Sequence, residues 1–413
     1  MPIRRRILLL SAPLALLAAC GENPQQHFAQ AQAAFAADDY AGARKHLIAA
    51  LKDKPDDRAM LTLFARTLLR MHDPDGADVA IERLRRHGGG AAEIARFSAE
   101  AALLRGKPDK ALALLGEDDD PAAWRIRATA RLNLGDVAGA TEAFERGMAA
   151  GNDIYLMADY ARFRLDNAEI DAARAIAQRM RAAAPGAFET QMVLGQVAAA
   201  RMETGAAVAA FRKAAETNPR RFEPVLAQAD MLSLDGKTYA TMALVAQADQ
   251  LAPGEPRVLA MKLQLLSEKG DWARIRAMLQ PREAGLDPQS PEGMTYGEAL
   301  LRLGHTEQAR MLFGRAVLLA PRDRHARTML GEAQLAVGDA AGAWVTLRPL
   351  TQSAIALPRE LELAEKAARL AGDDAADRIR ARLHSDRYRA QVALAGNAQG
   401  AAARGDWEGA VAA

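Results

Sequence analysis

The feature that most constrains the fold is an alanine that recurs about every 34 residues along the chain. It stands five positions after a glycine in four similar segments, for example Gly135 to Ala140 and Gly338 to Ala343. The marker positions are Ala43, Ala77, Ala111, Ala140, Ala173, Ala207, Thr241, Ile275, Ala309, Ala343, Ala376 and Ala410. Ten of the eleven steps are 33 or 34 residues, and one is 29. This period predicts an array of stacked structural units rather than separate globular domains.

A second column of small residues tests the register of the repeat. Twelve positions before each marker the residue is Ala or Gly in eleven of the twelve units, Leu263 being the exception. Side chains this small are needed where two helices cross at short range. Large apolar residues such as Phe144 and Phe313 follow the marker by four positions and are expected to fill the space beside the crossing. Prolines such as Pro55 and Pro185, twelve positions after their markers, are expected to end a helix.

Together these columns resemble the tetratricopeptide repeat, a helix-turn-helix unit of this length. Trp124, Leu194-Gly195, Tyr296-Gly297 and Leu330-Gly331 also fall on the family's aromatic and Leu-Gly positions. The resemblance implies an all-α fold, a right-handed superhelical solenoid of about twelve units that occupies residues 24–413.

Two irregularities interrupt the array. The step of 29 removes five residues near 115–121, which predicts a shortened second helix followed by a solvated acidic turn. A calcium loop is not expected there, because the glycine and the distal glutamate of the EF-hand pattern are missing. The twelfth unit, residues 391–413, is incomplete and has no polar cap, so we expect the native chain to continue or the last unit to fray.

The N-terminus has the layout of a secretory signal. Arginines at positions 4–6 precede an apolar stretch at 7–19, which is too short to span a membrane. Residues 17–20 (LAAC) resemble the lipobox of bacterial lipoproteins, which implies removal of residues 1–19, lipidation of Cys20 and a tether of residues 20–23. Gly21 in place of aspartate favours the outer membrane weakly over the inner. The alternative is an ordinary signal peptide with a chance cysteine.

Charge and residue clusters argue against nucleic-acid binding and catalysis. Without the three signal arginines, 51 basic residues face 52 acidic ones, so no global attraction to nucleic acid is expected. The seven histidines form no H-x-x-x-H pair, and no serine lies in a G-x-S-x-G elbow. We therefore expect no enzyme activity, no cofactor, no metal site and no small-molecule substrate.

The family resemblance implies a concave groove lined by first-helix residues. One such position directly follows each small crossing residue, and it is polar in all twelve units. Its charged members predicted to bind a partner are Arg66, Arg162, Asp230, Glu298, Glu332 and Glu365, with Met294 and Leu335 as apolar neighbours. Polar residues that simply face water are one interpretation. The other is that the acidic C-terminal half accepts a basic segment of a partner protein.

The combined prediction is a lipid-anchored periplasmic scaffold that joins envelope proteins in an assembly or export system. The opening units, from Asp39 to Leu84, resemble larger repeat lipoproteins associated with exosortase and exopolysaccharide export. Two alternatives remain open at this point. One is a glycan-binding repeat protein, which the 5% aromatic content argues against. The other is a non-catalytic subunit of an envelope enzyme complex.

Overall fold

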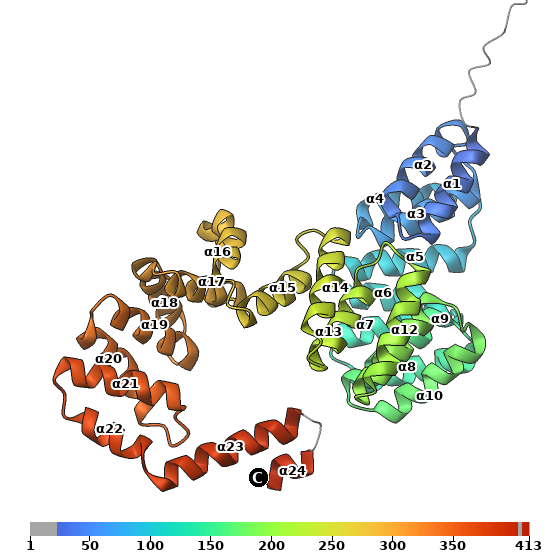
Figure 1. Cartoon of the computed structure of the whole chain (residues 1–413). Helices are drawn as coiled ribbons and strands as arrows, with labels where there is room; N and C mark the ends of the chain where they lie inside the picture. Colours follow the sequence, from blue (N-terminus) through green and yellow to red (C-terminus); the bar gives the residue numbers. More distant parts are fainter. Residues whose placement is uncertain (1–22, 404–406, 413) are drawn as a thin grey trace, which may run out of the picture. The chain divides into compact units, whose positions relative to one another are not determined.

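The computed structural model describes residues 23–403 and 407–412 (Figure 1). Over these residues every regular element is helical, with 24 α-helices and the 3-10 helix η1 (Gln280–Gly285). Consecutive helices pack against each other from α1 (Pro24–Ala36) to α11 (Phe188–Ala200) and from α13 (Glu223–Leu234) to α24 (Trp407–Ala412), so the predicted all-α array of helix-turn-helix units is confirmed.

The helices alternate between the first and second positions of the repeat. The first helices are α1 (Pro24–Ala36), α3 (Arg58–Arg70), α5 (Ala91–Leu104), α7 (Pro121–Asn133), α9 (Ile154–Asp166), α11 (Phe188–Ala200), α13 (Glu223–Leu234), α15 (Pro256–Glu268), α17 (Pro291–Arg302), α19 (Arg324–Ala336), α21 (Pro358–Ala371) and α23 (Asp386–Ala403). The second helices are α2 (Tyr40–Asp53), α4 (Pro74–Arg86), α6 (Pro108–Leu115), α8 (Val137–Ala150), α10 (Ile170–Ala183), α12 (Thr204–Thr217), α14 (Thr238–Leu251), α16 (Trp272–Leu279), α18 (Thr306–Leu319), α20 (Ala340–Thr351), α22 (Ala375–Leu383) and α24 (Trp407–Ala412).

The recurring Gly-Asp pair forms the turn between the two helices of a unit. Gly338 ends α19 with φ of 86°, a left-handed conformation that glycine adopts without strain. Asp339 then caps α20, because its carboxylate accepts a hydrogen bond from the Gly342 amide at 2.8 Å. Four residues later Ala343 is fully buried at the helix crossing. The glycine, the aspartate and the marker alanine therefore end the first helix, begin the second helix and form the contact between them.

The small crossing residues are small because a large side chain already occupies the facing space. A Cβ added to Gly331 would lie 2.4 Å from Cγ of Leu347, and one added to Gly297 would lie 2.6 Å from Cζ of Phe313. Leu347 and Phe313 are fully buried. These contacts confirm that the column four positions after the marker fills the space beside the crossing.

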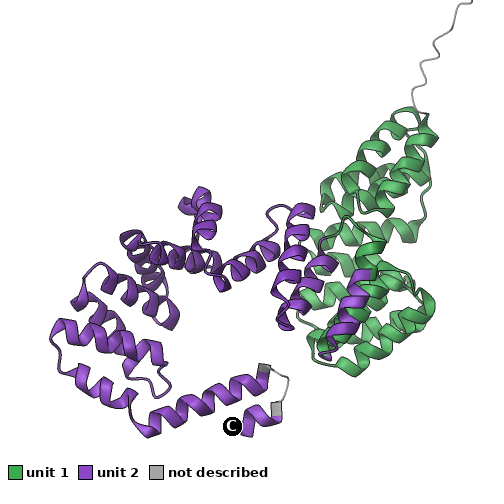
Figure 2. Ribbon diagram, in the orientation of Figure 1, with its two compact units in different colours: residues 1–200, 213–221 green, residues 201–212, 222–413 purple. Residues whose placement is uncertain are grey.

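The chain divides into two compact units (Figure 2). Of the described residues, unit 1 comprises 23–200 and 213–221, and unit 2 comprises 201–212, 222–403 and 407–412. Three hydrophobic clusters follow one another through the helix pairs of unit 1, and two clusters do so in unit 2. Each unit is thus held by a core extended along the array.

Unit 1 contains a contact between residues far apart in sequence. The segment after α12 meets the turn between α1 and α2, where the Asn218 amide donates to Asp38 at 2.6 Å. Arg220 pairs with Asp39 at 2.7 Å, and Arg221 lies 3.5 Å from Asp38. We call these five residues the closing contact, because it joins the turn between α1 and α2 to residues 218–221 at the other end of unit 1.

Two second helices are short, for different reasons. The five-residue deletion leaves α6 with 8 residues. The turn that follows is not simply solvated, because the Asp118 side chain is only 13% exposed and pairs with Arg96 at 3.0 Å. Arg127 also donates to the Gly116 and Asp118 carbonyls. In contrast, α16 ends after 8 residues at Leu279 and gives way to η1, whose second residue is Pro281.

Candidate partner-binding surface

The predicted groove column lies where the repeat pattern places it, beside the buried crossing residues. Eleven of the twelve crossing residues are buried, and Ala398 is the half-buried exception. None of the twelve polar residues that follow them is buried. Because successive helix positions point about 100° apart, a buried residue is followed by one that turns away from the core. The column is therefore a surface, as the polar pattern requires.

In unit 1, Arg66 and Arg162 are exposed. The Arg66 guanidinium lies over the Phe35 ring, 5.2 Å from its centroid, and Arg162 pairs with Asp159 at 3.3 Å. Arg70, one turn after Arg66, lies 5.6 Å from the Tyr155 ring centroid, although these residues belong to α3 and α9. Side chains of different first helices thus contact one another within unit 1, and aromatic rings lie next to two of the arginine charges.

In unit 2, the predicted acidic residues are paired with arginines of the same chain. Arg302 lies between Glu298, at 3.0 Å, and Glu332, at 3.2 Å. Arg359 approaches the other carboxylate oxygen of Glu332 at 2.6 Å. The Glu332 side chain is only 17% exposed, so its charge is held by two cations at a partly desolvated site.

Glu365 continues this arrangement on α21. It pairs with Arg369 at 3.5 Å and with Arg380 from α22. A cavity of about 460 Å³ opens beside it, lined by α21, α22 and the start of α23, with Leu383 and Val392 on its apolar wall. We call Glu298, Glu332 and Glu365, with Arg302, Arg359 and Arg380, the Glu–Arg row.

The remaining predicted residues of unit 2 differ from this row. Desolvation raises the pKa of Asp230, and the Arg257 charge opposes that shift. Met294 and Leu335 are half-buried and pack against hydrophobic clusters, so part of each side chain belongs to the core. These two residues offer only their exposed portions to a partner.

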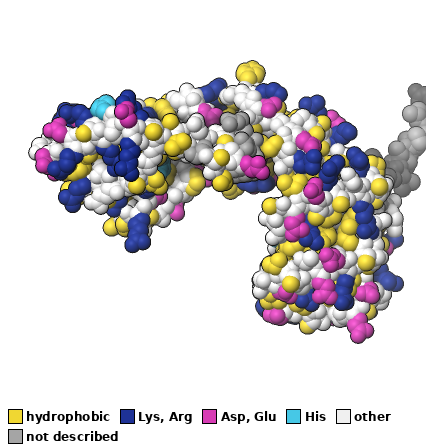
Figure 3. Space-filling view, turned by 90° about the horizontal axis from the view of Figure 1, so that it is seen from below, with side chains coloured by type: hydrophobic (Ala, Val, Ile, Leu, Met, Phe, Trp, Pro, Cys, Tyr) yellow, Lys and Arg dark blue, Asp and Glu magenta, His cyan; other side chains and the backbone are white. Residues whose placement is uncertain are grey.

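The arginine partners were missed by sequence reasoning, although part of the signal was present. Glu298 and Arg302 are four residues apart, as are Glu365 and Arg369, which is the spacing of ion pairs on one helix face. The pairs Glu332–Arg359 and Glu365–Arg380 join different helices, and local spacing does not reveal them. The net effect is a face of alternating charge. Figure 3 likewise shows acidic and basic side chains interspersed over the surface.

The lipidation residue Cys20 lies outside the described residues. Among the helices of residues 23–403 and 407–412, none is long and apolar enough to cross a membrane.

Comparisons with known proteins show similarity in structure only. No family model and no curated protein matches the sequence. Yeast Tom70 matches with 15% identity and a TM-score of 0.42, covering 86% of this chain and 90% of that one. Pseudomonas aeruginosa PilF matches with 15% identity and a TM-score of 0.38, covering 58% of this chain and 96% of that one. Human IFIT1, solved with m7Gppp-AAAA, matches with 16% identity and a TM-score of 0.44, covering 84% of this chain and 81% of that one. No partner or activity is transferred from such distant matches.

Proposed function

We propose that the chain is a lipid-anchored, non-catalytic scaffold of the bacterial periplasm that joins envelope proteins through the first-helix faces of its repeats. The observation that carries the proposal is the Glu–Arg row, a series of paired charged side chains on successive repeats of unit 2. Helical repeat arrays use such extended faces to bind other proteins. The lipobox-like residues 17–20 support anchoring, preferentially in the outer membrane.

The pairing within the row changes what the partner must supply. A basic segment of a partner would replace Arg302, Arg359 or Arg380 beside the glutamates. The displaced arginine side chains would then be hydrated by solvent. Such an exchange makes binding specific for a partner whose basic residues are spaced like the glutamates, rather than for any partner with a positive net charge. Because these arginines are 36–52% exposed, the exchange should be sensitive to salt.

A photo-crosslinking residue at the exposed position Ala336, one turn after Glu332, tests the proposal in cells. We expect a dominant envelope protein that carries a basic segment, identified by mass spectrometry. Capture should fall strongly when Glu298, Glu332 and Glu365 are changed together to glutamine. The matched control changes Glu142 and Glu307 to glutamine, since both are exposed, pair with arginines of their own second helices and should leave capture intact.

Unchanged capture by the triple variant would refute a role for the Glu–Arg row. Crosslinks to polysaccharide alone would replace the scaffold by a glycan-binding protein. The identity of the captured protein also tests the pathway, for which we propose exopolysaccharide export on the N-terminal likeness from Asp39 to Leu84.

Anchoring is tested separately by Cys20→Ser. Two or three acyl chains, at about 0.8 kcal/mol per buried methylene, hold a protein at a membrane essentially permanently. The native chain should therefore incorporate labelled fatty acid, and the variant should not. Absence of label from the native chain would contradict the lipoprotein assignment.

A further inference from the structure

The short helix α16 leaves unoccupied a place that other repeats fill with their own chain. The neighbouring second helices α14 and α18 have 14 residues each, whereas α16 has 8. The six missing residues correspond to about 9 Å of helix. Pro281 cannot donate the backbone hydrogen bond that would continue α16, so the chain turns into η1 instead.

The residue seven positions after the repeat marker shows what is lost. In eight other units this residue is buried, and it belongs to the last turns of the second helix: Ala50, Leu84, Gly147, Met180, Ala214, Ala248, Ala316 and Leu350. In the unit of α16 the same position is Arg282, which is exposed. An exposed arginine thus stands at the position that these other units fill with a small or apolar buried residue.

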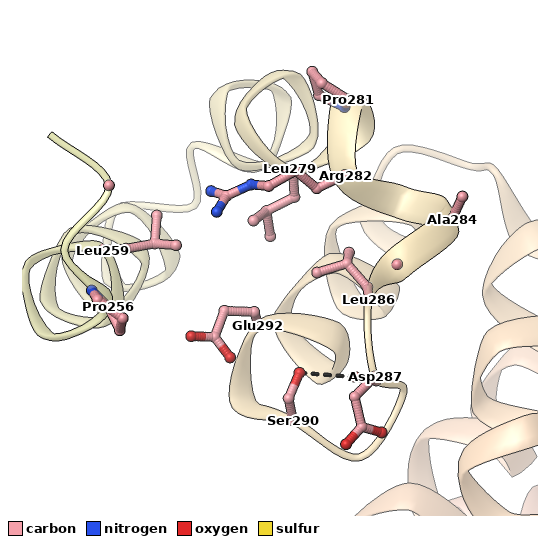
Figure 4. A pocket seen from close by; sticks show the side chains of 12 residues that line it. Pro256, Leu259, Leu279, Pro281, Arg282, Ala284, Leu286, Asp287, Ser290 and Glu292 are labelled. Carbon is pink, nitrogen blue, oxygen red and sulfur yellow. Dashed lines mark hydrogen bonds between the residues drawn. The ribbon is translucent and has the colours of Figure 1, made fainter. Parts of the chain in front are cut away.

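A cavity of about 530 Å³ lies at this place. Its apolar wall contains Leu259 of α15, Leu279 of α16 and Leu286 from the loop after η1. In Figure 4 the side chains of Arg282 and Glu292 extend toward the space that separates Leu259 from the other two leucines. The loop that forms the rim is fixed, because the Ser290 hydroxyl donates to the Asp287 carbonyl at 2.7 Å and also caps α17.

The other short helix, α6, provides an internal comparison. There the turn is filled by the chain itself, since Arg127 is 8% exposed and stacks 4.2 Å from the Trp124 ring centroid while it binds two turn carbonyls. Beside α16 the chain fills the place only in part, since Leu286 packs against the hydrophobic core and Pro288 is buried, while the cavity remains. Arg282 and Glu292 form no ion pair within residues 23–403, in contrast to the glutamates of the Glu–Arg row.

We propose that this cavity binds a short α-helical segment of a partner protein, which supplies the turns missing from α16. The segment would place an alanine- to leucine-sized side chain against Leu259, Leu279 and Leu286. An acidic residue on it would face Arg282, and a basic residue would face Glu292. A helix suits the cavity because helical turns fill the equivalent seam in the neighbouring repeats. The inference rests on the proposed scaffold function and adds a docking site separate from the Glu–Arg row.

The test uses the full mature chain and fluorescent helical peptides of about ten residues, or 15 Å. One peptide carries a central leucine with an acidic and a basic residue placed for Arg282 and Glu292. The second has the two charges exchanged. We expect saturable binding by anisotropy, with the double variant Arg282→Glu, Glu292→Lys reversing the preference between peptides about tenfold, or 1.4 kcal/mol. Arg322→Glu, at an exposed arginine of unit 2 outside the cavity lining, should leave the preference unchanged.

A second pair of variants tests the site without reversing charges. Ala284→Trp should occupy the cavity and weaken both peptides, because Ala284 is an exposed lining residue. Pro281→Ala with Arg282→Ala should extend α16, raise helicity in circular dichroism and abolish binding, since the chain would then fill its own seam. Absence of binding by both peptides, or binding unaffected by these variants, would overturn the inference. Retained capture through the Glu–Arg row in that case would leave the scaffold function standing.

Discussion

Gly331→Ala tests most directly whether the crossing residue of a repeat must be small because a large side chain faces it. The added Cβ would lie 2.4 Å from Cγ of Leu347 and within 2.7 Å of both its methyl groups. Leu347 is fully buried, so its side chain cannot avoid the added Cβ by moving into solvent. Overpacking of a core costs about 1–3 kcal/mol, while Gly→Ala in a helix gains about 1 kcal/mol of propensity. We therefore expect a net loss of up to about 2 kcal/mol in the free energy of unfolding.

A double-mutant cycle separates this contact from the helix propensity. Leu347→Ala alone should cost about 2–5 kcal/mol, because it leaves a cavity at a fully buried site. Combined with Gly331→Ala, the new methyl group occupies part of that cavity. The two changes together should then cost at least about 1 kcal/mol less than the sum of their separate effects.

Gly314→Ala is the matched control, because an added Cβ there meets no atom within 4 Å. It lies inside α18 and should stabilise the protein by about 1 kcal/mol. The assay is urea unfolding followed by far-UV circular dichroism, with midpoints compared at constant slope. Stabilisation by Gly331→Ala similar to that of Gly314→Ala, with no coupling to Leu347, would refute the close-approach explanation of the column.

Two further predictions concern ionic contacts. The Gly42 amide and the Arg220 guanidinium hold the pKa of Asp39 below its usual range, so its contribution to stability is present above about pH 4 and is lost as the pH falls toward the lowered value. Thermal unfolding across acidic pH should show this loss in the native chain and a weaker one in Asp39→Asn; identical profiles would contradict it. Glu360, 2% exposed, accepts two hydrogen bonds from Arg324, and Glu360→Ala should cost about 1–3 kcal/mol in urea unfolding, whereas the exposed Glu362→Ala should be nearly neutral. A nearly neutral effect of Glu360→Ala would contradict this expectation.

The features predictable from sequence are those set by local geometry that recurs in every unit. A left-handed residue, an aspartate cap and a small crossing residue recur at fixed positions in most units, so their spacing indicates the helices, although His72 and Met202 replace glycine at the left-handed position. Gly331 and Asp339 illustrate this, since their roles follow from position within the repeat. Pro281 is similar, because the end of α16 could have been inferred from it.

The charge pairing could not be predicted as well, because it depends on which side chains of neighbouring repeats reach each other. Arg359 and Glu332 are 27 residues apart, and Asn218 and Asp38 are 180 residues apart. Pairing between long flexible side chains of different repeats produces no periodic pattern in the sequence. The sequence therefore located a polar column of first-helix residues that lies at the surface, but not the arginines that pair with its glutamates.

The closing contact also limits how unit 1 can change in length. An open array tolerates the gain or loss of a helix pair, because each pair touches only its neighbours. Here an inserted pair between Tyr40 and Thr217 would displace Asn218 from Asp38 by roughly the 8–10 Å that separates packed helices, far beyond hydrogen-bonding reach. Duplication or deletion within this segment would break the contact, whereas the same event in unit 2 meets no such constraint among the interactions described. A change in the number of repeats in unit 1 would therefore remove the interactions between its two ends.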